Sequence, residues 1–213
     1  MIEYIKILKN QEMRGKKGQN MKKYEEEKYR FENIKDRIYP WVRGELPTPY
    51  AVNGKHISEK DTPVVSFIGG LGIIFVIKRD EDVFEVLKDH MLMPECDVEA
   101  LYYASCENLV RDVEFVIGNT WYGGFAILAD GWHEASALCF KHIWQVCVDK
   151  LKDDLVIMAP TRETVLFAPA SQKEAVRKMT EHGRQAYAQA KDKISEDLMV
   201  FSKDRKELML YKE

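Results

Sequence analysis

Two stretches of this sequence share one pattern of acidic, apolar and polar residues at an offset of 43 positions. They read DDLVIMAPTRETVLF at 153–167 and EDLMVFSKDRKELML at 196–210. In both, Asp-Leu opens an apolar run, a polar turn carries an arginine, and a second apolar run follows. Apolar runs around a short polar turn are typical of β-hairpins. The pattern therefore predicts two antiparallel hairpins, with Leu155 and Leu198 equivalent and with Arg162 and Arg205 at exposed turns.

Each hairpin follows a stretch with the spacing of an amphipathic helix, so the repeat indicates a folding unit used twice. The expected helices cover 21–40, 82–90, 98–113, 131–150 and 171–193. Asp97, Asp130 and Ser171 are suited to cap the last three. The expected strands cover 63–80 as a hairpin, 114–118 and 122–129. We expect an α+β fold with a mainly antiparallel sheet, repeated helix-plus-hairpin units, and helices packed on the sheet.

The charge of the chain is unevenly distributed. Residues 1–23 contain seven Lys or Arg and two Glu, so the net charge of -3 for the whole chain leaves -8 for residues 24–213. We expect a basic N-terminal arm or extension at 1–23, then a single α+β domain, as one body or as two sub-lobes at 24–118 and 119–213. Prolines and turn residues predict a long loop at 44–63. The acidic body argues against a general nucleic-acid or anionic-membrane binder.

The sequence shows no sign of membrane insertion or secretion. No apolar run approaches the roughly 20 residues that a membrane-spanning helix needs, and the N-terminus lacks the apolar core of a signal peptide. The four cysteines, Cys96, Cys106, Cys139 and Cys147, have no CxxC spacing and are too few for a disulfide scaffold. We therefore expect free thiols and a cytoplasmic protein that does not enter a membrane.

The densest group of functional residue types lies at 118–144, in GNTWYGGFAILADGWHEASALCFKHIW. A helix that begins at Asp130-Gly131 leaves backbone N–H groups there for an anion or a carboxylate. Glycines and aromatic residues of this kind also serve as turns and core filling. We place a candidate binding surface in this segment, together with a turn arginine that could hold an anion. Its residues are Trp121, Tyr122, Asp130, Gly131, Trp132, His133, Glu134 and Arg162.

The same segment lacks a complete catalytic or metal-binding pattern. His133-Glu134 points to a metalloprotease, but that chemistry needs a second histidine where Ala137 stands. His142 is nine residues from His133, which places the two on opposite sides of a helix. Cys139 could touch His142, yet it falls on the apolar side of the expected helix. Glu134 falls on the side expected to face solvent. We expect no catalytic residues, no metal and no cofactor.

Two segments carry a resemblance to a known family. They are ALYYASCEN, with Leu101, Tyr102, Ala104 and Asn108, and DLVIMAPTRETVLFAPAS, with Asp154, Leu155, Ile157, Pro160, Glu163, Leu166, Pro169 and Ala170. With FAILADGWHEASALC between them, they resemble an uncharacterised bacterial domain family, loosely YtpQ-like, of anaerobic gut bacteria and mobile elements. The resemblance covers about residues 30–213. It rests on packing and turn residues, so it implies a fold and no activity.

The sequence supports three functional hypotheses. The first is a cytoplasmic domain without enzymatic activity that binds a protein partner, in regulation or in conflict between mobile elements and their hosts. The second is a small-molecule or nucleotide hydrolase with its site around 118–142, where His133 and Glu134 act as acid and base. The third is nucleic-acid binding through the basic arm and the 171–193 helix, which the adjacent acidic residues argue against. The partner's identity and the oligomeric state stay open.

Overall fold

The computed structural model describes residues 29–44, 50–52, 55–57, 62–81, 83–87 and 97–211. The chain divides into two compact units. The first unit comprises Met1–Trp41, Glu45–Phe67 and Gly72–Asp112, and the second comprises Val42–Gly44, Ile68–Leu71 and Val113–Glu213. The predicted arm at 1–23 lies outside the described residues. Part of the predicted loop at 44–63 also lies outside them, and its described part is not all loop, because 50–52 and 55–57 are paired strands.

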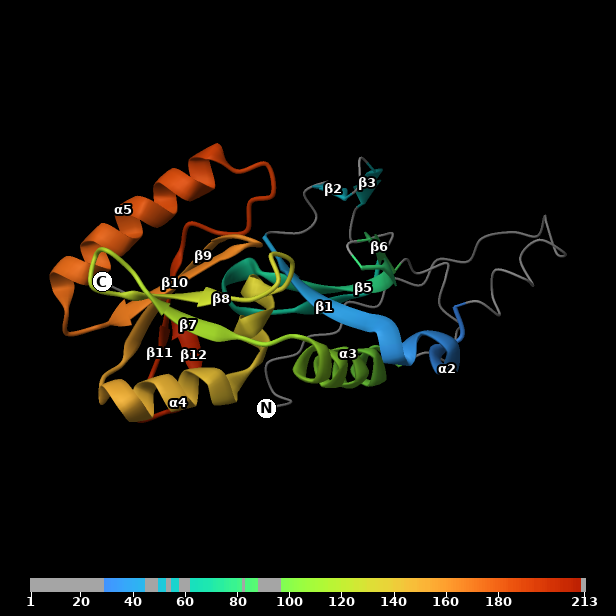
Figure 1. Ribbon diagram of the computed structural model, residues 1–213, viewed down its shortest axis with the longest axis horizontal. Helices are drawn as coiled ribbons and strands as arrows, with labels where there is room; N and C mark the ends of the chain where they lie inside the picture. Colours follow the sequence, from blue (N-terminus) through green and yellow to red (C-terminus); the bar gives the residue numbers. More distant parts are fainter. Residues whose placement is uncertain are drawn as a thin grey trace, which may run out of the picture. The chain divides into compact units, whose positions relative to one another are not determined.

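The first unit is built around the long strand β5, which β1 and β4 flank and with which β6 also pairs (Figure 1). Its elements are α2 (Phe31–Ile34), η2 (Lys35–Arg37), β1 (Ile38–Arg43), β2 (Tyr50–Val52), β3 (Lys55–Ile57), β4 (Val64–Ser66), β5 (Gly72–Asp80), β6 (Val83–Val86) and α3 (Val98–Asp112). β4 and β6 run antiparallel to β5, and β2 and β3 form a separate antiparallel pair. The predicted hairpin at 63–80 is therefore confirmed.

Two of the predicted helices are wrong in this unit. The helix expected as far as Pro40 ends at Ile34, and the next residues form a 3-10 turn and then β1. Every residue of β1 is buried, because its β-branched and aromatic side chains pack on both sides of the strand. The helix expected at 82–90 is replaced over its described part by β6, where Phe84 and Val86 are buried and Val83 is exposed. That alternation has the period of a strand.

The predicted helix at 98–113 is confirmed as α3. Its first turn is capped as expected, because the Asp97 carboxylate accepts a hydrogen bond from the Glu99 N–H. Asn108 is buried and donates from Nδ2 to the carbonyls of Lys35, at 2.5 Å, and Ile38, at 2.9 Å. These bonds tie α3 to the chain that enters β1.

The second unit contains a six-stranded sheet in the order β12-β11-β9-β10-β8-β7 (Figure 1). Its elements are η3 (Ile68–Gly70), β7 (Val116–Asn119), β8 (Phe125–Leu128), η5 (Glu134–Cys139), α4 (Lys141–Leu151), β9 (Leu155–Thr161), β10 (Thr164–Pro169), α5 (Lys173–Gln189), β11 (Leu198–Phe201) and β12 (Leu208–Leu210). All neighbouring strands in this sheet are antiparallel. Together with the helices, this confirms the predicted α+β fold.

The repeated sequence pattern forms two hairpins, as predicted. β9 pairs with β10 and β11 pairs with β12, and Leu155 and Leu198 each open the first strand of their hairpin. The hairpins also pair with each other, because β11 lies antiparallel to β9 with Phe201 opposite Leu155. The repeat is therefore one continuous piece of sheet.

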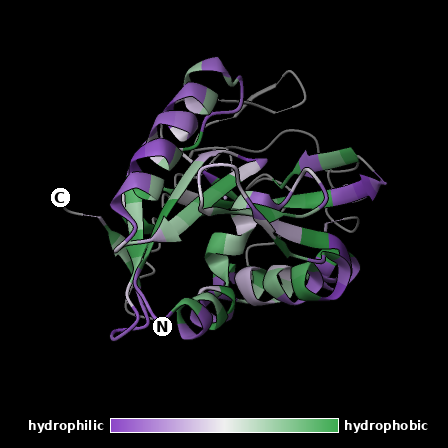
Figure 2. Cartoon of the chain, turned by 60° about the vertical axis from the view of Figure 1, so that its left-hand side comes forward, coloured by the Kyte–Doolittle hydropathy of each residue, from purple (hydrophilic) through white to green (hydrophobic). Residues whose placement is uncertain are grey.

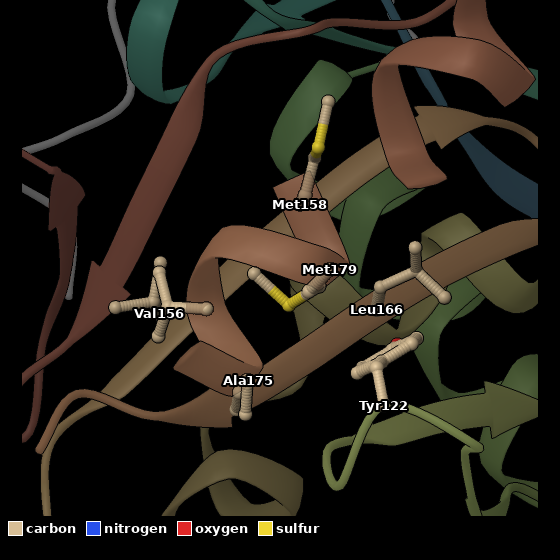
Figure 3. Packing of buried hydrophobic residues seen from close by; sticks show 8 residues of the cluster. Tyr122, Val156, Met158, Leu166, Ala175 and Met179 are labelled. Atoms are coloured by element: carbon tan, nitrogen blue, oxygen red, sulfur yellow. The ribbon is translucent and has the colours of Figure 1, made fainter. Parts of the chain in front are cut away.

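Helices cover both faces of the β9–β10 hairpin. On one face, α5 packs Ala175, Val176 and Met179 against Met158 and Leu166 of the strands (Figure 3). On the other face, Phe167 contacts Trp144 of α4 edge-on, with ring centroids 5.5 Å apart. Figure 2 shows strands that are mainly hydrophobic and an α5 that is largely hydrophilic on the side away from them. This is the pattern of a surface helix covering a sheet.

The predicted helix at 131–150 is interrupted. The residues expected to cap it and the next helix, Asp130 and Ser171, are not the N-cap residues of η5 and α5. Phe140 has an extended backbone with φ -107° and ψ 93°, so the 3-10 helix η5 and the α-helix α4 are separate elements. Ser171 does not cap α5 through its side chain; its N–H donates to Asp153 Oδ2 at 2.9 Å. α5 ends at Gln189, short of the predicted 193. None of the described helices combines the length and apolar character that crossing a membrane requires.

Gly183 should be required for the packing of α5 on the sheet. A Cβ atom at this position would lie 2.4 Å from Sδ of the buried Met158. We expect Gly183→Ala to destabilise the protein by about 1–2 kcal/mol in urea unfolding, because overpacking a buried contact costs up to about 3 kcal/mol and the gain in helix propensity offsets only ~1 kcal/mol of it. Gln185→Ala, on the exposed side of the same helix, is the control. A Gly183→Ala variant as stable as the wild type would contradict the close contact.

Tyr39 should titrate late. Burial, together with the hydrogen bond that its hydroxyl donates to Asp112 Oδ2 at 2.6 Å, raises the pKa of Tyr39 to about 12. Because the pKa in the unfolded chain is about 10, this group stabilises the fold below pH ~10 and loses that effect as the pH rises through about 12. The absorbance at the tyrosinate band, as the difference between wild type and Tyr39→Phe, measures the step. In Asp112→Asn the midpoint should fall; a Tyr39 step near pH 10 in the wild type would disprove the assignment.

Candidate functional site

The predicted site residues lie in two groups at opposite ends of β8. Trp121 and Tyr122 belong to the turn at 120–124, which joins β7 to β8. Asp130, Gly131, Trp132, His133 and Glu134 follow the other end of the strand, and Arg162 lies with them. The four residues of β8 span roughly 13 Å. The residues predicted to form one binding surface therefore belong to two separate features.

The turn at 120–124 buries one aromatic residue and exposes the next. The Thr120 N–H donates to the Gly124 carbonyl at 3.0 Å, and Gly123 has a φ of 85°, which favours glycine. Tyr122 is buried in the core beneath α5 (Figure 3). Trp121 is 75% exposed and meets the Tyr122 ring edge-on at 5.6 Å. Trp121 is thus a large apolar side chain held on the surface by a buried neighbour.

The loop at 129–134 is closed by its own acidic side chains. Glu134 Oε1 accepts from the N–H groups of Ala129, at 3.1 Å, and Gly131, at 2.8 Å. Asp130 Oδ1 accepts from the N–H groups of Trp132 and His133, and its Oδ2 lies 2.8 Å from His133 Nδ1. Glu134 is only 5% exposed, so the prediction that it lies on the solvent-exposed side of a helix is wrong. It replaces water as the acceptor for two backbone donors.

The electrostatics of the loop favour an ionised Asp130. Burial by itself would raise the pKa of Asp130, but the hydrogen bonds from His133 and from the backbone N–H groups outweigh it and hold the pKa below its usual value. His133 is 1% exposed. His133 therefore holds the loop from inside the protein, whereas Asp130 keeps 40% of its side chain exposed.

Arg162 lies against this loop and not in solvent as predicted. Its guanidinium carbon sits 4.2 Å from the centre of the Trp132 ring, a cation–π contact. It forms ion pairs with Glu163 at 2.8 Å and with Asp192 at 3.7 Å, and the buried Arg43 also pairs with Asp192. By contrast, its counterpart in the second hairpin, Arg205, is exposed as predicted. The two hairpins are equivalent, but their turn arginines are not.

This arrangement gives the hydrolase hypothesis no support. That hypothesis needs His133 and Glu134 in an open cleft, and both side chains are buried and hold the loop. A hollow formed by described residues of the same unit lies elsewhere, lined mainly by Ile68, Leu71, Met199 and Leu210. Within the part of the chain that the structure describes, no group of three or more His, Cys, Asp or Glu is placed to hold a metal ion.

The basic residues of the 171–193 helix, the second element of the nucleic-acid hypothesis, are partly paired with acidic residues of the same helix. Arg177 forms ion pairs with Glu174, at 2.8 Å, and Glu181, at 2.5 Å. Lys178 also pairs with Glu174 at 3.3 Å. Lys191 falls within the predicted 171–193 helix but lies beyond the end of α5. A helix face whose charges are paired in this way presents a weak field to nucleic acid.

The most exposed apolar surface in the second unit is the β7–β8 hairpin, which the sequence prediction covered only at Trp121. Val116 is 49% exposed, Ile117 43% and Leu128 53%. Val116 lies directly opposite Leu128, so these two side chains share one face of the sheet, and Ile117 lies on the other face. A sequence signal was available: residues 115–129, FVIGNTWYGGFAILA, include no charged residue. We refer to the exposed side of Val116–Asn119 as the β7 edge.

The β7 edge differs from the opposite edge of the same sheet. β12 contacts η3, and the turn that precedes it is rich in charged residues, KDRKE at 203–207. Charges and covering segments of this kind prevent unwanted strand pairing at a sheet edge. β7 pairs with β8 in continuous register, without a bulge, proline or charge. Of the two edges, β7 is the one without these protective features.

Comparison of this chain with protein-family models, with curated proteins and with solved structures finds no match in any of the three. The resemblance to a YtpQ-like family stays a prediction.

Glu134 should stabilise the loop at 129–134 through its two accepted hydrogen bonds. Glu134→Ala leaves two backbone N–H groups without an acceptor, and we expect a loss of about 1–3 kcal/mol in unfolding free energy. Glu134→Gln keeps an oxygen acceptor and should lose clearly less. Glu196→Ala, at an exposed position of the same unit, is the control. Equal losses for the alanine and glutamine variants would show that the carboxamide oxygen does not replace Oε1 in holding the loop.

Proposed function

We propose that this protein is a protein-binding domain that receives an extended segment of a polypeptide as an added strand beside the β7 edge. The observation that carries the proposal is an uncharged edge strand whose apolar side chains are exposed on both faces of the sheet. Exposed apolar edges mark sites of strand addition, where main-chain hydrogen bonds supply affinity and side chains supply specificity.

The backbone of β7 is arranged to bind such a segment. In an antiparallel pair, opposite residues alternate between those that exchange hydrogen bonds with each other and those whose N–H and C=O groups point outward. The Thr120 N–H bonds to the carbonyl of Gly124, its opposite residue in the continued register. Val116 and Gly118 alternate with the outward residues in the same way as Thr120, so their N–H and C=O groups also face β8. The peptide groups of Ile117 and Asn119 therefore face outward, ready for a partner strand.

The side chains around β7 define what the segment should contain. Val116 and Leu128 form an apolar platform over Gly118, where a Cβ atom would lie 3.0 Å from Leu128 Cδ1. Ile117 offers a second apolar contact on the other face. The bound segment should therefore carry apolar, strand-forming residues on both faces and few charges near its middle.

We place this function in the cytoplasm and in regulation. Cys106, Cys139 and Cys147 are free thiols, which fits a reducing compartment. The acid and histidine side chains of the 129–134 loop are engaged in structure. A domain with an open binding edge and with its best candidate acid and base in a structural role suits regulation by association better than chemistry.

A peptide selection tests the proposed function. Immobilised wild-type protein is used to select binders from a random peptide display library, and the selected peptides are then measured by titration calorimetry. We expect peptides rich in β-branched and aromatic residues. Ile117→Lys should weaken them about tenfold or more, because the lysine brings a charge to an apolar strand contact.

Val146→Lys is the matched control, since Val146 is 48% exposed but lies on α4. This variant should bind the peptides as the wild type does. Selected peptides that bind wild type and Ile117→Lys equally would exclude the β7 edge as the binding site.

A further inference from the structure

We infer that the segment bound at the β7 edge is β7 of a second copy of this chain, paired antiparallel about a two-fold axis. This inference rests on the proposed function, because it names the partner of the same edge. Three observations carry it. Alternate residues of β7 point their N–H and C=O groups outward, apolar side chains lie on both faces of the strand, and the strand has no charge.

The two-fold axis determines how the strands align. In a symmetric antiparallel pair, one residue must lie opposite its own copy. Ile117 has outward N–H and C=O groups, so Ile117 of each copy can donate to and accept from Ile117 of the other. In the same alignment Asn119 lies opposite Phe115 of the second copy, whose N–H and C=O groups also point outward. The whole length of β7 is then paired.

This alignment also matches apolar side chains on both faces. Ile117 meets Ile117 of the second copy on one face. On the other face, Val116 lies opposite Gly118 of the second copy, beside the Leu128 side chain that covers that glycine. Moving the axis to Asn119 would instead separate the two isoleucines and set one asparagine against the other. The Ile117 alignment therefore buries the most apolar surface.

The charges near the strand permit this pairing. Residues 115–129 are uncharged, so the seam, meaning the two paired β7 strands, contains no like-charge pair. The acid nearest to β7 is Glu114, which is exposed. In the antiparallel alignment Glu114 lies opposite Thr120 of the second copy, at the far end of the seam from the other Glu114. A parallel alignment would set the two glutamates side by side, which destabilises strand pairs.

The seam is short, so the association should be weak. Strand pairs of this length bury less than the standard protein interface of about 1,600 Å². A Kd from about 1 µM to about 1 mM is therefore expected. A complex in this range forms and separates with concentration.

Sedimentation equilibrium of the full chain over the same concentration range tests the inference. The mean mass of the wild type should rise from 24.8 kDa toward twice that value. Ile117→Lys should stay at the monomer mass, and Val146→Lys should associate like the wild type. A wild type that stays monomeric, or an Ile117→Lys variant that still dimerises, overturns the inference.

Amide hydrogen exchange of the wild type by NMR gives a second measurement that needs no variant. The N–H groups of Ile117 and Asn119 should exchange quickly at low concentration and gain protection at high concentration. The N–H groups of Val116 and Gly118, which face β8, should be protected throughout. Outward amides that exchange equally fast at both concentrations contradict the β7 pairing.

The two proposals fail separately. A monomeric wild type that binds selected peptides through Ile117 overturns the inference and leaves the proposed function standing. A monomeric wild type with no peptide that depends on Ile117 overturns both. Concentration-dependent protection of Ile117 and Asn119 supports both.

Discussion

The second unit depends on burying both faces of the β9–β10 hairpin. Residues 155–160 are all buried, and alternate side chains pack under α5 on one face and toward α4 on the other. A hairpin covered on both faces also needs a strand along each edge, because its outer peptide groups are deep in the protein. β11 fills one edge and β8 fills the other. Each added strand has unpaired peptide groups on its own outer side. On one side of the sheet the last strand is β7, whose outer peptide groups meet solvent.

Much of the fold could be predicted from local sequence, and the misses have physical reasons. The β9–β10 and β11–β12 hairpins have both apolar strands and polar turns within a few residues. In β1 and β6 the local signal was ambiguous: Ile34 and Ile38 have helical spacing, and β6 is only four residues long. What makes β1 a strand is its pairing in the sheet around β5, which lies some 30 residues later in the chain. Phe140 likewise breaks a helix whose apolar spacing is continuous.

The candidate site was harder to predict than the fold. Composition singled out the tryptophans, glycines and His133-Glu134, but it could not show that Glu134 turns inward to bond the backbone of its own loop. Arg162 reaches Trp132 only because the β9–β10 turn folds back onto that loop, where the Ala135 N–H donates to the Arg162 carbonyl. The edge position of β7 depends on the order of all six strands. An uncharged run in the sequence fits an interior strand equally well, and only the sheet order distinguishes the two.

The pairing of β11 with β9 has a consequence for how the chain folds during synthesis. β9 and β10 leave the ribosome before α5 and β11, so the apolar first strand of the hairpin waits for a partner from more than 35 residues later. Until then the nascent chain exposes a second open strand edge besides β7. Non-local pairings of this kind form slowly and leave partly folded chains prone to aggregation.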